Sequence, residues 1–309
     1  MRRIAACCLA LLCAACGSGT STPSASSTQV IARVGPTAIT ADLFAIRLQS
    51  ALSSVTQAGG PTDNAAMTAQ VRASVLRSLL IDTVIAQEAA AAGVAATAAE
   101  IQAQVAQDVS AAGGTSQLES QLASLGGSMA QLDDEARSSI NEQNLEDLFA
   151  RQRAAEVEQK LAAGASMASL APQYSDDSAS APTGGELGSI TRATISTGDA
   201  AFSTAVFALS VGQYTTTPIR DSQGYDIVLV EASTPTALTL RHIIIEAPVP
   251  YTVKARPAWF SEAIFEQLAT DCAANQIAIY ISNVGDNPCA AASASPSPSA
   301  SSPVASPAP

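Results

Sequence analysis

The sequence predicts an α+β fold in which a helical region precedes a small antiparallel sheet with surrounding helices. Apolar residues recur along residues 68–92 with the spacing of one helix face, which indicates a long amphipathic helix. Residues 225–231 and 238–246 alternate between apolar and polar or are continuously apolar, as strands are. The six residues Ala232–Ala237 between them suit a connection between antiparallel strands. A chain of 309 residues is long enough for two domains.

Short signals mark the ends of the remaining elements. Residues 31–35 alternate like a strand, and Gly35-Pro36 marks a turn. Thr40 is a helix N-cap, and Thr97 with Glu100 forms a capping box at the start of another helix. Periodicity then predicts, in order, a short helix around 118–125, a longer helix that runs to about 163, a strand at 216–219, a helix at 257–270 and a strand at 277–281.

The charge and the rarity of histidine exclude several classes of function. Lys and Arg total 15 against 27 Asp and Glu, so the formal net charge is −12. A nucleic-acid-binding protein needs a basic face, which this composition argues against. His242 is the single histidine, which excludes a metal site with two histidine ligands. No phosphate-binding loop, dinucleotide-binding motif or metal-ligand cluster stands out, so we expect neither a cofactor nor a metal.

The N-terminus is typical of a targeting segment. Two arginines and then twelve residues rich in Ala, Leu and Cys precede Cys16, a run that is too short to span a bilayer but suits a signal peptide at 1–15. Leu12-Cys13-Ala14-Ala15-Cys16 resembles a bacterial lipoprotein signal, which implies cleavage before Cys16, acylation of its thiol and a lipid anchor in the membrane. Cys13 stands where that signal usually has leucine, and an ordinary signal peptide cut elsewhere is the alternative. Residues 16–28 are expected to be a flexible tether.

Two cysteines remain beyond the N-terminal segment, Cys272 and Cys289. An exported protein meets an oxidising compartment, where a disulfide between them would close a loop of about 17 residues. Two unpaired thiols are the alternative. Both cysteines belong to an expected C-terminal extension at 247–289 that consists of a helix and a strand. Residues 290–309 contain only Ala, Ser, Pro and one Val, and we expect them to be disordered because they have no apolar surface to bury.

Four blocks in the second half of the chain follow one another in the order found in a known family. They are Leu170–Asp177 (LAPQYSDD), Gly184–Gly188 (GGELG), residues 202–213 with Phe202, AVFAL and VGQ, and Gly224–Val230 (GYDIVLV). This set resembles a parvulin-type peptidyl-prolyl isomerase and implies a parvulin-like domain at 151–246. Residues 29–150 resemble the helical N-terminal chaperone region of SurA/PrsA-type foldases.

The resemblance implies a catalyst of rotation about X–Pro amide bonds in unfolded or newly exported proteins. An apolar cup that holds the proline ring, together with polar groups at the rotating carbonyl, would favour the twisted amide over the planar one. By resemblance the cup consists of Leu187, Phe202 and Ile195, where relatives usually carry Met, and Gln223 belongs to the same substrate site. Ordinary core packing is the alternative role of the three apolar residues.

The polar centre departs from the pattern of the family. The position that holds Cys or Asp in the family falls on Asp177, with Asp176 as the competing assignment and a surface turn as the alternative. Asp226 stands where the family has the histidine of its G-[YIF]-H-I-I strand. An aspartate carboxylate accepts hydrogen bonds, but it cannot offer the donor and acceptor of a neutral imidazole.

The family has another histidine on an H-I-L strand ahead of the first helix of the domain, and no such strand is expected there in this chain. Instead, Arg241–Ile245 (RHIII) resembles that strand and follows the other motifs. We hypothesise that it is a permuted first strand beside 225–231, which would bring His242 close to Asp226. Two alternatives stay open: His242 begins a second, degenerate parvulin-like unit, or it is a half-buried strand residue without a catalytic role.

The sequence therefore predicts a membrane-anchored, extracytoplasmic peptidyl-prolyl isomerase and foldase, with Asp177, Asp226 and His242 as candidate catalytic residues. A holdase chaperone that keeps this architecture without turnover is the alternative, and the missing histidine at position 226 favours it. A lipoprotein that binds a solute or the cell wall is a third possibility, for which the chain shows no ligand motif.

Overall fold

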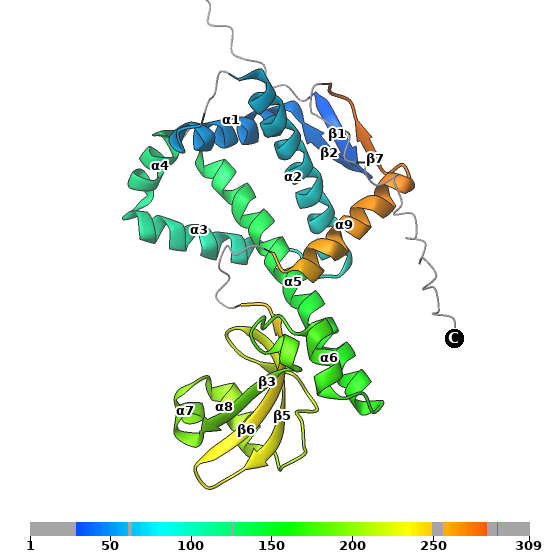
Figure 1. The fold of residues 1–309 in the computed structure, drawn as a ribbon. Helices are drawn as coiled ribbons and strands as arrows, with labels where there is room; N and C mark the ends of the chain where they lie inside the picture. Colours follow the sequence, from blue (N-terminus) through cyan, green and yellow to red (C-terminus); the bar gives the residue numbers. More distant parts are fainter. Residues whose placement is uncertain (1–28, 61–63, 125–126, 249–255, 283–288, 290–309) are drawn as a thin grey trace, which may run out of the picture.

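The computed structural model describes residues 29–60, 64–124, 127–248, 256–282 and 289. Figure 1 shows two parts, an upper one that we call the helical domain and a lower one that we call the sheet domain. The long helix α5 (Met129–Ala162) passes from the first into the second. The predicted signal peptide, Cys16, the tether and the tail at 290–309 lie outside the described residues.

The helical domain contains elements from both ends of the described chain. Its N-terminal elements are β1 (Val30–Val34), β2 (Thr37–Thr40), α1 (Ala41–Gln57), α2 (Ala65–Ala91), α3 (Ala98–Ala112), α4 (Thr115–Ser124) and the first part of α5. Its C-terminal elements are α9 (Ala258–Ala273) and β7 (Ile277–Ile279). The sheet domain contains α6 (Met167–Tyr174), a short 3-10 helix (Ala181–Thr183), β3 (Glu186–Thr191), α7 (Arg192–Thr197), α8 (Ala200–Ala208), β4 (Ile219–Arg220), β5 (Gly224–Ser233) and β6 (Ala237–Glu246).

Side-chain caps start the helices where the sequence predicts them. The hydroxyl of Thr40 accepts a hydrogen bond from the backbone N–H of Leu43 at the start of α1. At α3, the backbone N–H of Glu100 donates to the Thr97 hydroxyl, and the Thr97 N–H donates to the Glu100 carboxylate at 2.8 Å. Each cap satisfies backbone donors that have no partner inside the helix.

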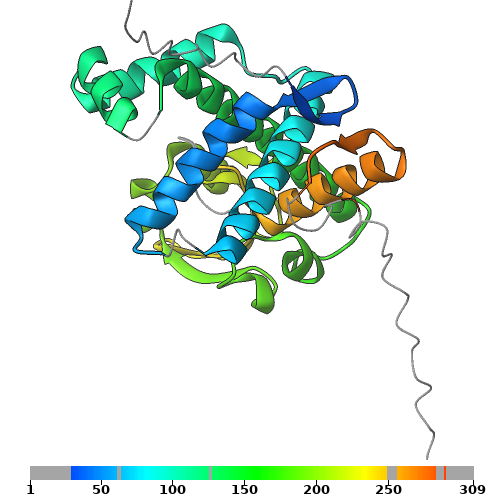
Figure 2. The same cartoon turned by 90° about the horizontal axis from the view of Figure 1, so that it is seen from above.

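The C-terminal segment completes the core of the helical domain. Strand β7 pairs antiparallel with β1, so the upper sheet has the order β2-β1-β7. Phe260 and Ile264 of α9 are buried in the same apolar core as Leu76 and Leu80 of α2. Seen from above in Figure 2, α9 runs beside α2, which in turn runs beside α1. Helix α9 and strand β7, which lie in the expected extension at 247–289, thus pack within the helical domain.

A disulfide fixes the end of the described chain to α9. Cys272, in the last turn of α9, is bonded to Cys289 with an S–S distance of 2.07 Å. The bond closes a loop that contains β7, an edge strand of the upper sheet.

Helix α5 belongs to both domains, so the expected boundary at residue 150 falls inside it. Leu145 is buried in the core of the helical domain, whereas Ala154 and Val157 are buried against the lower sheet. The Asp147 carboxylate accepts hydrogen bonds from the Arg220 guanidinium at 2.8 Å and from the Tyr225 hydroxyl at 3.0 Å. These contacts attach the sheet domain to the middle of α5.

The lower sheet has the order β3-β6-β5-β4 with antiparallel neighbours. Strand β6 lies between the GGELG strand β3 and the GYDIVLV strand β5, with His242 opposite Val228. The predicted antiparallel pairing of 225–231 with 238–246 is confirmed. The strand predicted at 216–219 is confined to Ile219–Arg220, because residues 216–218 lie outside the ladder with β5.

The two faces of this sheet have different coverings, because successive side chains of a strand point to opposite faces. Ile227, Ile243 and Ile245 point towards α5 and α6 and share a core with Leu170 and Val157. The other face of β5 and β6 packs its apolar residues with those of β3, α7 and α8.

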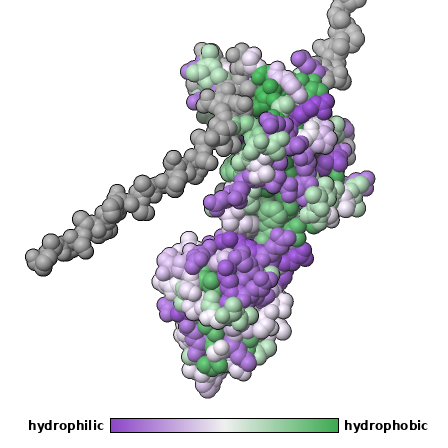
Figure 3. All heavy atoms as spheres, turned by 90° about the vertical axis from the view of Figure 1, so that its right-hand side faces the viewer, coloured by the Kyte–Doolittle hydropathy of each residue, from purple (hydrophilic) through white to green (hydrophobic). Residues whose placement is uncertain are grey.

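The surface differs between the two domains on the side shown in Figure 3. Hydrophilic residues gather where the sheet domain meets α5, and apolar patches are more evident on the helical domain. Between residues 151 and 160 of α5, the exposed residues are polar: Arg151, Gln152, Glu156 and Gln159. None of the described helices combines the length and the apolar character that a membrane span requires.

Candidate active site

A cluster of three titratable side chains, two of them buried, lies at one end of the lower sheet. His242 on β6 and Asp226 on β5 point to the same face, and Nδ1 of His242 is 3.2 Å from both carboxylate oxygens of Asp226. Asp226 pairs with Ile244 across the ladder, so the two side chains are diagonal neighbours. On the other side of the ring, Nε2 of His242 is 3.1 Å from Oδ2 of Asp177. We call Asp177, His242 and Asp226 the Asp–His–Asp cluster.

A tight turn after α6 holds Asp177 against the imidazole. Its Oδ1 accepts the backbone N–H of Ala179 at 3.0 Å, and its Oδ2 accepts the Ser180 hydroxyl at 2.5 Å. The Ser180 oxygen also lies 3.1 Å from Nε2 of His242. Asp177 and Ser180 thus form one acceptor group for the same ring nitrogen.

The electrostatics of the cluster favour a charged histidine. Burial would lower the pKa of His242, but hydrogen bonds and charges of Asp226 and Asp177 outweigh it and raise the pKa above its ordinary value. The Ser180 hydrogen bond, with further help from His242, lowers the pKa of Asp177 to about 2. Burial raises the pKa of Asp226, and the imidazolium opposes that rise. An ionised aspartate only accepts hydrogen bonds, so two carboxylates suit an imidazolium that donates from both nitrogens.

The paired glycines of the GGELG motif allow β6 to approach the turn that carries the cluster. Gly185 has φ +85°, and its carbonyl accepts the backbone N–H of His242 at 2.8 Å. A Cβ atom at Gly185 would lie 2.1 Å from the carbonyl oxygen of His242. The second glycine therefore serves the strand that carries the histidine.

Asp176, the competing assignment for Asp177, has different partners. Its Oδ2 accepts the indole N–H of Trp259 at 2.9 Å and the backbone N–H of Glu246 at 2.8 Å. The structure brings Asp177, and not Asp176, to His242.

The predicted apolar cup lies on the same sheet face as the Asp–His–Asp cluster. Leu187, Ile195 and Phe202 pack together with Val228 and Leu240, which lie next to Asp226 and His242 along β5 and β6. Ile195 is buried, whereas Leu187 and Phe202 are half-buried. An apolar surface with accessible side chains therefore borders a polar centre, as a site for an X–Pro segment requires.

The fourth predicted substrate residue, Gln223, lies apart from both groups. It is exposed in the turn between β4 and β5, and its backbone carbonyl accepts the N–H of Ala247 at 2.9 Å. It is in neither the Asp–His–Asp cluster nor the apolar cluster.

Exposure distinguishes the three members of the Asp–His–Asp cluster. The side chain of Asp177 is 27% exposed, against 10% for His242 and 5% for Asp226. A peptide bound on this face would meet Asp177 first, with His242 and Asp226 beneath it.

Sequence reasoning missed Ser180, which is buried and contacts two members of the cluster. The available signal was the Ser/Asp-rich segment 175–180, in which an aspartate side chain accepts the backbone N–H two residues on and so forms a turn, as Asp177 does with Ala179. Within the described part of the chain, no three His, Cys, Asp or Glu side chains are grouped so that they could hold a metal ion.

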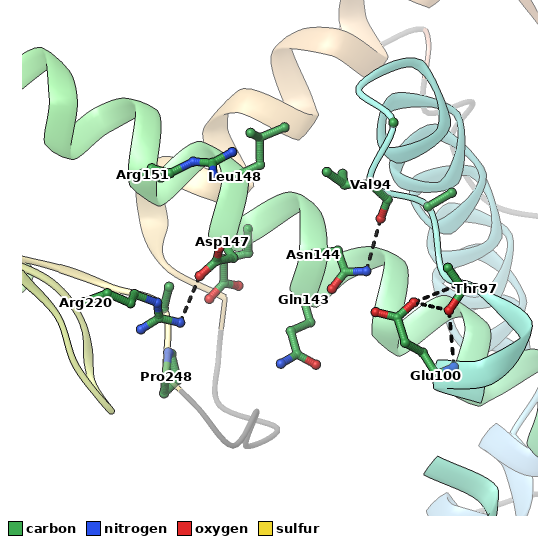
Figure 4. A pocket seen from close by; sticks show the side chains of 14 residues that line it. Val94, Thr97, Glu100, Gln143, Asn144, Asp147, Leu148, Arg151, Arg220 and Pro248 are labelled. Atoms are coloured by element: carbon green, nitrogen blue, oxygen red, sulfur yellow. Dashed lines mark hydrogen bonds and ion pairs between the residues drawn. The ribbon is translucent and has the colours of Figure 1, made fainter. Parts of the chain in front are cut away.

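A cavity of about 520 Å³ lies elsewhere, between the α2–α3 connection, α5 and the end of β6 (Figure 4). Its wall includes Asn144, Asp147 and Arg220, and the last two form an ion pair at 2.8 Å. Glu146 also lines it, and burial, with the charge of Glu142 next, raises the pKa of Glu146 to about 7. None of the candidate catalytic or substrate-binding residues lines this cavity.

Two family models match overlapping parts of the chain. Residues 138–232 match the Rotamase family, a PPIC-type PPIase domain, and residues 2–146 match a SurA-like N-terminal domain. The first match ends before β6, which begins at Ala237. His242 therefore lies beyond the matched segment while its strand occupies the centre of the sheet.

One related protein and one solved structure carry the same kind of name. The foldase protein PrsA of Pediococcus pentosaceus is 39% identical over 75 residues, which are 24% of this chain and 25% of that protein. The aligned segment thus spans a quarter of the length of that relative. The crystal structure of the foldase protein PrsA from Streptococcus pneumoniae matches with 12% identity and a TM-score of 0.28, covering 81% of this chain and 95% of that one.

Proposed function

We propose that this chain, which belongs to the parvulin-type (PPIC-type) peptidyl-prolyl isomerases and carries a SurA-like N-terminal domain, isomerises X–Pro bonds in unfolded or newly exported proteins. The observation that carries the proposal is the Asp–His–Asp cluster beside the apolar cluster of Leu187, Ile195 and Phe202 on one sheet face. The sheet domain would hold the proline, and the helical domain would assist folding of the same client.

The reaction needs no covalent step. Rotation about an X–Pro amide faces a barrier of about 18–20 kcal/mol because the planar bond is conjugated. Conjugation places negative charge on the carbonyl oxygen, and this charge falls as the amide twists. A carboxylate beside that oxygen therefore disfavours the planar form more than the twisted one, which lowers the barrier.

Asp177 is the group that fits this role. It is the most exposed member of the cluster, and its low pKa keeps it ionised at neutral pH. His242, with Asp226 beneath it, would orient Asp177 and hold it in place. The apolar residues Ile195 and Phe202 would bind the proline ring and leave the preceding residue free to rotate.

A peptide assay tests the proposal. The wild-type chain is expected to accelerate cis–trans isomerisation of an Ala-Pro peptide, and Asp177→Ala is expected to lower kcat/KM by about 100-fold without unfolding the protein. Asp133→Ala is the matched control, because Asp133 is an exposed aspartate of α5 far from the cluster in sequence. An unchanged rate in Asp177→Ala would contradict the assignment of Asp177.

A holdase without turnover is the second candidate function. Asp226 at the position of the family's histidine favours it, because the cluster has one imidazole where the family has two. The test is suppression of aggregation of an unfolded client by the wild-type chain. Suppression together with no acceleration of the Ala-Pro peptide would refute the isomerase and leave the holdase.

Attachment to the outer face of the cell membrane through Cys16 is part of the proposal. Its support is the sequence Leu12–Cys16 behind a short apolar run, followed by the flexible composition of residues 17–28. Expression in a bacterium with labelled palmitate should label the wild-type chain and not Cys16→Ala. Equal labelling of the two proteins would exclude Cys16 as the acylated residue.

A further inference from the structure

One contact between the domains ends beside the Asp–His–Asp cluster. Trp259 lies in the first turn of α9, a helix of the helical domain, and its indole N–H donates to Oδ2 of Asp176 at 2.9 Å. Asp176 is the immediate neighbour of Asp177 in the sequence. A residue far along the chain, beyond the isomerase motifs, thus reaches the turn that holds the most exposed member of the cluster.

Trp259 is built into both domains. Its ring packs against the core of the helical domain and against the core between α5, α6 and the lower sheet. It stacks edge-on against Phe260 at 6.0 Å, and the Arg153 guanidinium of α5 lies 6.0 Å from its ring centre. The indole therefore has a fixed position from which to donate its hydrogen bond.

The segment Ser175–Asp177 is fastened to β6 at each residue. The Ser175 hydroxyl accepts the N–H of Ile244, and the N–H of Asp176 donates to the Ile244 carbonyl at 2.8 Å. Oδ2 of Asp176 accepts the N–H of Glu246 at 2.8 Å, and Oδ2 of Asp177 then meets His242. The N–H groups of Glu246 and Trp259 both donate to Oδ2 of Asp176. Together they hold this carboxylate in place and fix the direction of the next residue.

Burial makes the Trp259 donor important. Desolvation raises the pKa of Asp176, and the hydrogen bonds from Glu246 and Trp259 oppose that rise. Without the indole N–H, the half-buried Asp176 carboxylate has one charge-assisted hydrogen bond fewer. A desolvated charged group with too few partners changes protonation or moves.

We propose that Trp259 is a positioning residue of the isomerase site: through Asp176 it holds the segment 175–177 so that Asp177 engages His242. This inference rests on the proposed function. It also means that the helical domain contributes directly to the geometry of the site, since α9 belongs to the core of that domain.

The decisive variant is Trp259→Phe, which keeps an apolar ring and removes the N–H donor. We expect its kcat/KM on an Ala-Pro peptide to fall by about 3- to 10-fold, the scale of one hydrogen bond. Tyr280→Phe is the matched control, because Tyr280 is a 60% exposed aromatic residue just after β7. Its kcat/KM should equal that of the wild type.

A second readout separates positioning from general destabilisation. His242 is the single histidine, so its ring resonances in NMR spectra report directly on the contact with Asp177. Trp259→Phe should shift these resonances in the direction in which Asp177→Asn shifts them, and Tyr280→Phe should not shift them. If Trp259→Phe does not fold, Asp176→Asn is measured in the same way.

Unchanged His242 resonances and an unchanged kcat/KM in folded Trp259→Phe would overturn the inference. If the wild-type chain shows no isomerase activity, the proposed function fails. The His242 resonances then still decide whether Trp259 positions Asp177, so the two failures are distinguishable.

Discussion

The two faces of the lower sheet are made from alternate residues of the same strands, yet the side chains that they bury differ in kind. Towards α5 and α6, Ile227, Ile243 and Ile245 form a continuous apolar layer with 0% exposure. On the opposite face the apolar layer of β5 and β6 stops at Asp226 and His242, where ionisable groups are buried instead. Burial of charged groups opposes folding unless they are paired, and here two carboxylates pair with one imidazole.

Asp226 and His242 interrupt an apolar layer that would otherwise cover this face of the sheet. Valine or isoleucine at positions 226 and 242 would continue the apolar layer without buried charge. We infer that the first face provides stability and the second provides the site. The following variants test whether the two faces have these separate roles, in order of decreasing expected effect.

The largest effect is expected from a truncation on the face of the sheet that packs against α5 and α6. Ile227→Ala removes buried methyl groups and leaves a cavity, so the free energy of unfolding should fall by about 2–5 kcal/mol. Because Ile227 points away from the cluster, kcat/KM per folded molecule should stay at the wild-type value. Denaturant unfolding and the peptide assay measure the two quantities. A fall in kcat/KM per folded molecule that accompanies the loss of stability would show that the two faces are not independent.

The next largest effect is expected when the face that carries Asp226 and His242 is made fully apolar. The double variant Asp226→Val/His242→Val should lose about 100-fold in kcat/KM. Its free energy of unfolding should stay equal or rise by about 1–4 kcal/mol, since well-packed apolar residues often replace a buried ion pair without loss. Each single variant should be less stable than the double variant. Asp226→Val leaves the buried imidazole with one carboxylate fewer, and His242→Val leaves the buried Asp226 carboxylate without its histidine. A double variant with full activity would refute the role of the cluster.

A smaller effect is expected from the apolar residues beside the cluster. Phe202→Ala should raise KM for an Ala-Pro peptide by about tenfold, with little change in kcat, because it removes contact with the proline ring. Phe207→Ala on the same helix α8 is the control, since the Phe207 ring lies 5.5 Å from the Arg192 guanidinium and outside the apolar cluster. Equal effects of the two variants would argue against a proline-binding role of Phe202.

The smallest effect concerns acid stability. The pKa of Asp177 is lowered from 3.8 to about 2, so the carboxylate stabilises the fold above pH 3.8, and this contribution disappears as the pH falls towards 2. Asp177→Asn lacks the ionisable group and should show a smaller drop in melting temperature across that interval. Thermal unfolding of both proteins between pH 5 and pH 2 measures the difference. Parallel curves would mean that Asp177 has an ordinary pKa.

The motifs of the sheet domain allowed much of its arrangement to be predicted. Alternation along 225–231 and 238–246 gives two neighbouring strands, and the RHIII segment places His242 near Asp226, as the register shows. Capping at Thr97 and Glu100 likewise marks the start of α3. These features depend on residues close together in the sequence, which is why local patterns reveal them.

Other features depend on contacts between distant segments, and local patterns do not contain them. The sequence predicts a strand at 277–281 but not its pairing with β1, which brings segments from near both ends of the described chain into one sheet. The choice between Asp176 and Asp177 is likewise decided by Trp259 and His242, which approach from α9 and β6. Only the folded arrangement separates two adjacent aspartates with identical chemistry.

The most direct test of the account is NMR exchange spectroscopy of an Ala-Pro peptide with the wild-type chain. One sample reports the rate of cis–trans exchange and, because His242 is the single histidine, the state of its ring. We expect exchange far faster than the uncatalysed tens to hundreds of seconds, a His242 pKa above its ordinary value of 6.5, and His242 resonances that move as the peptide binds. Catalysed exchange with His242 resonances unaffected by the peptide would place the active site elsewhere and contradict the account.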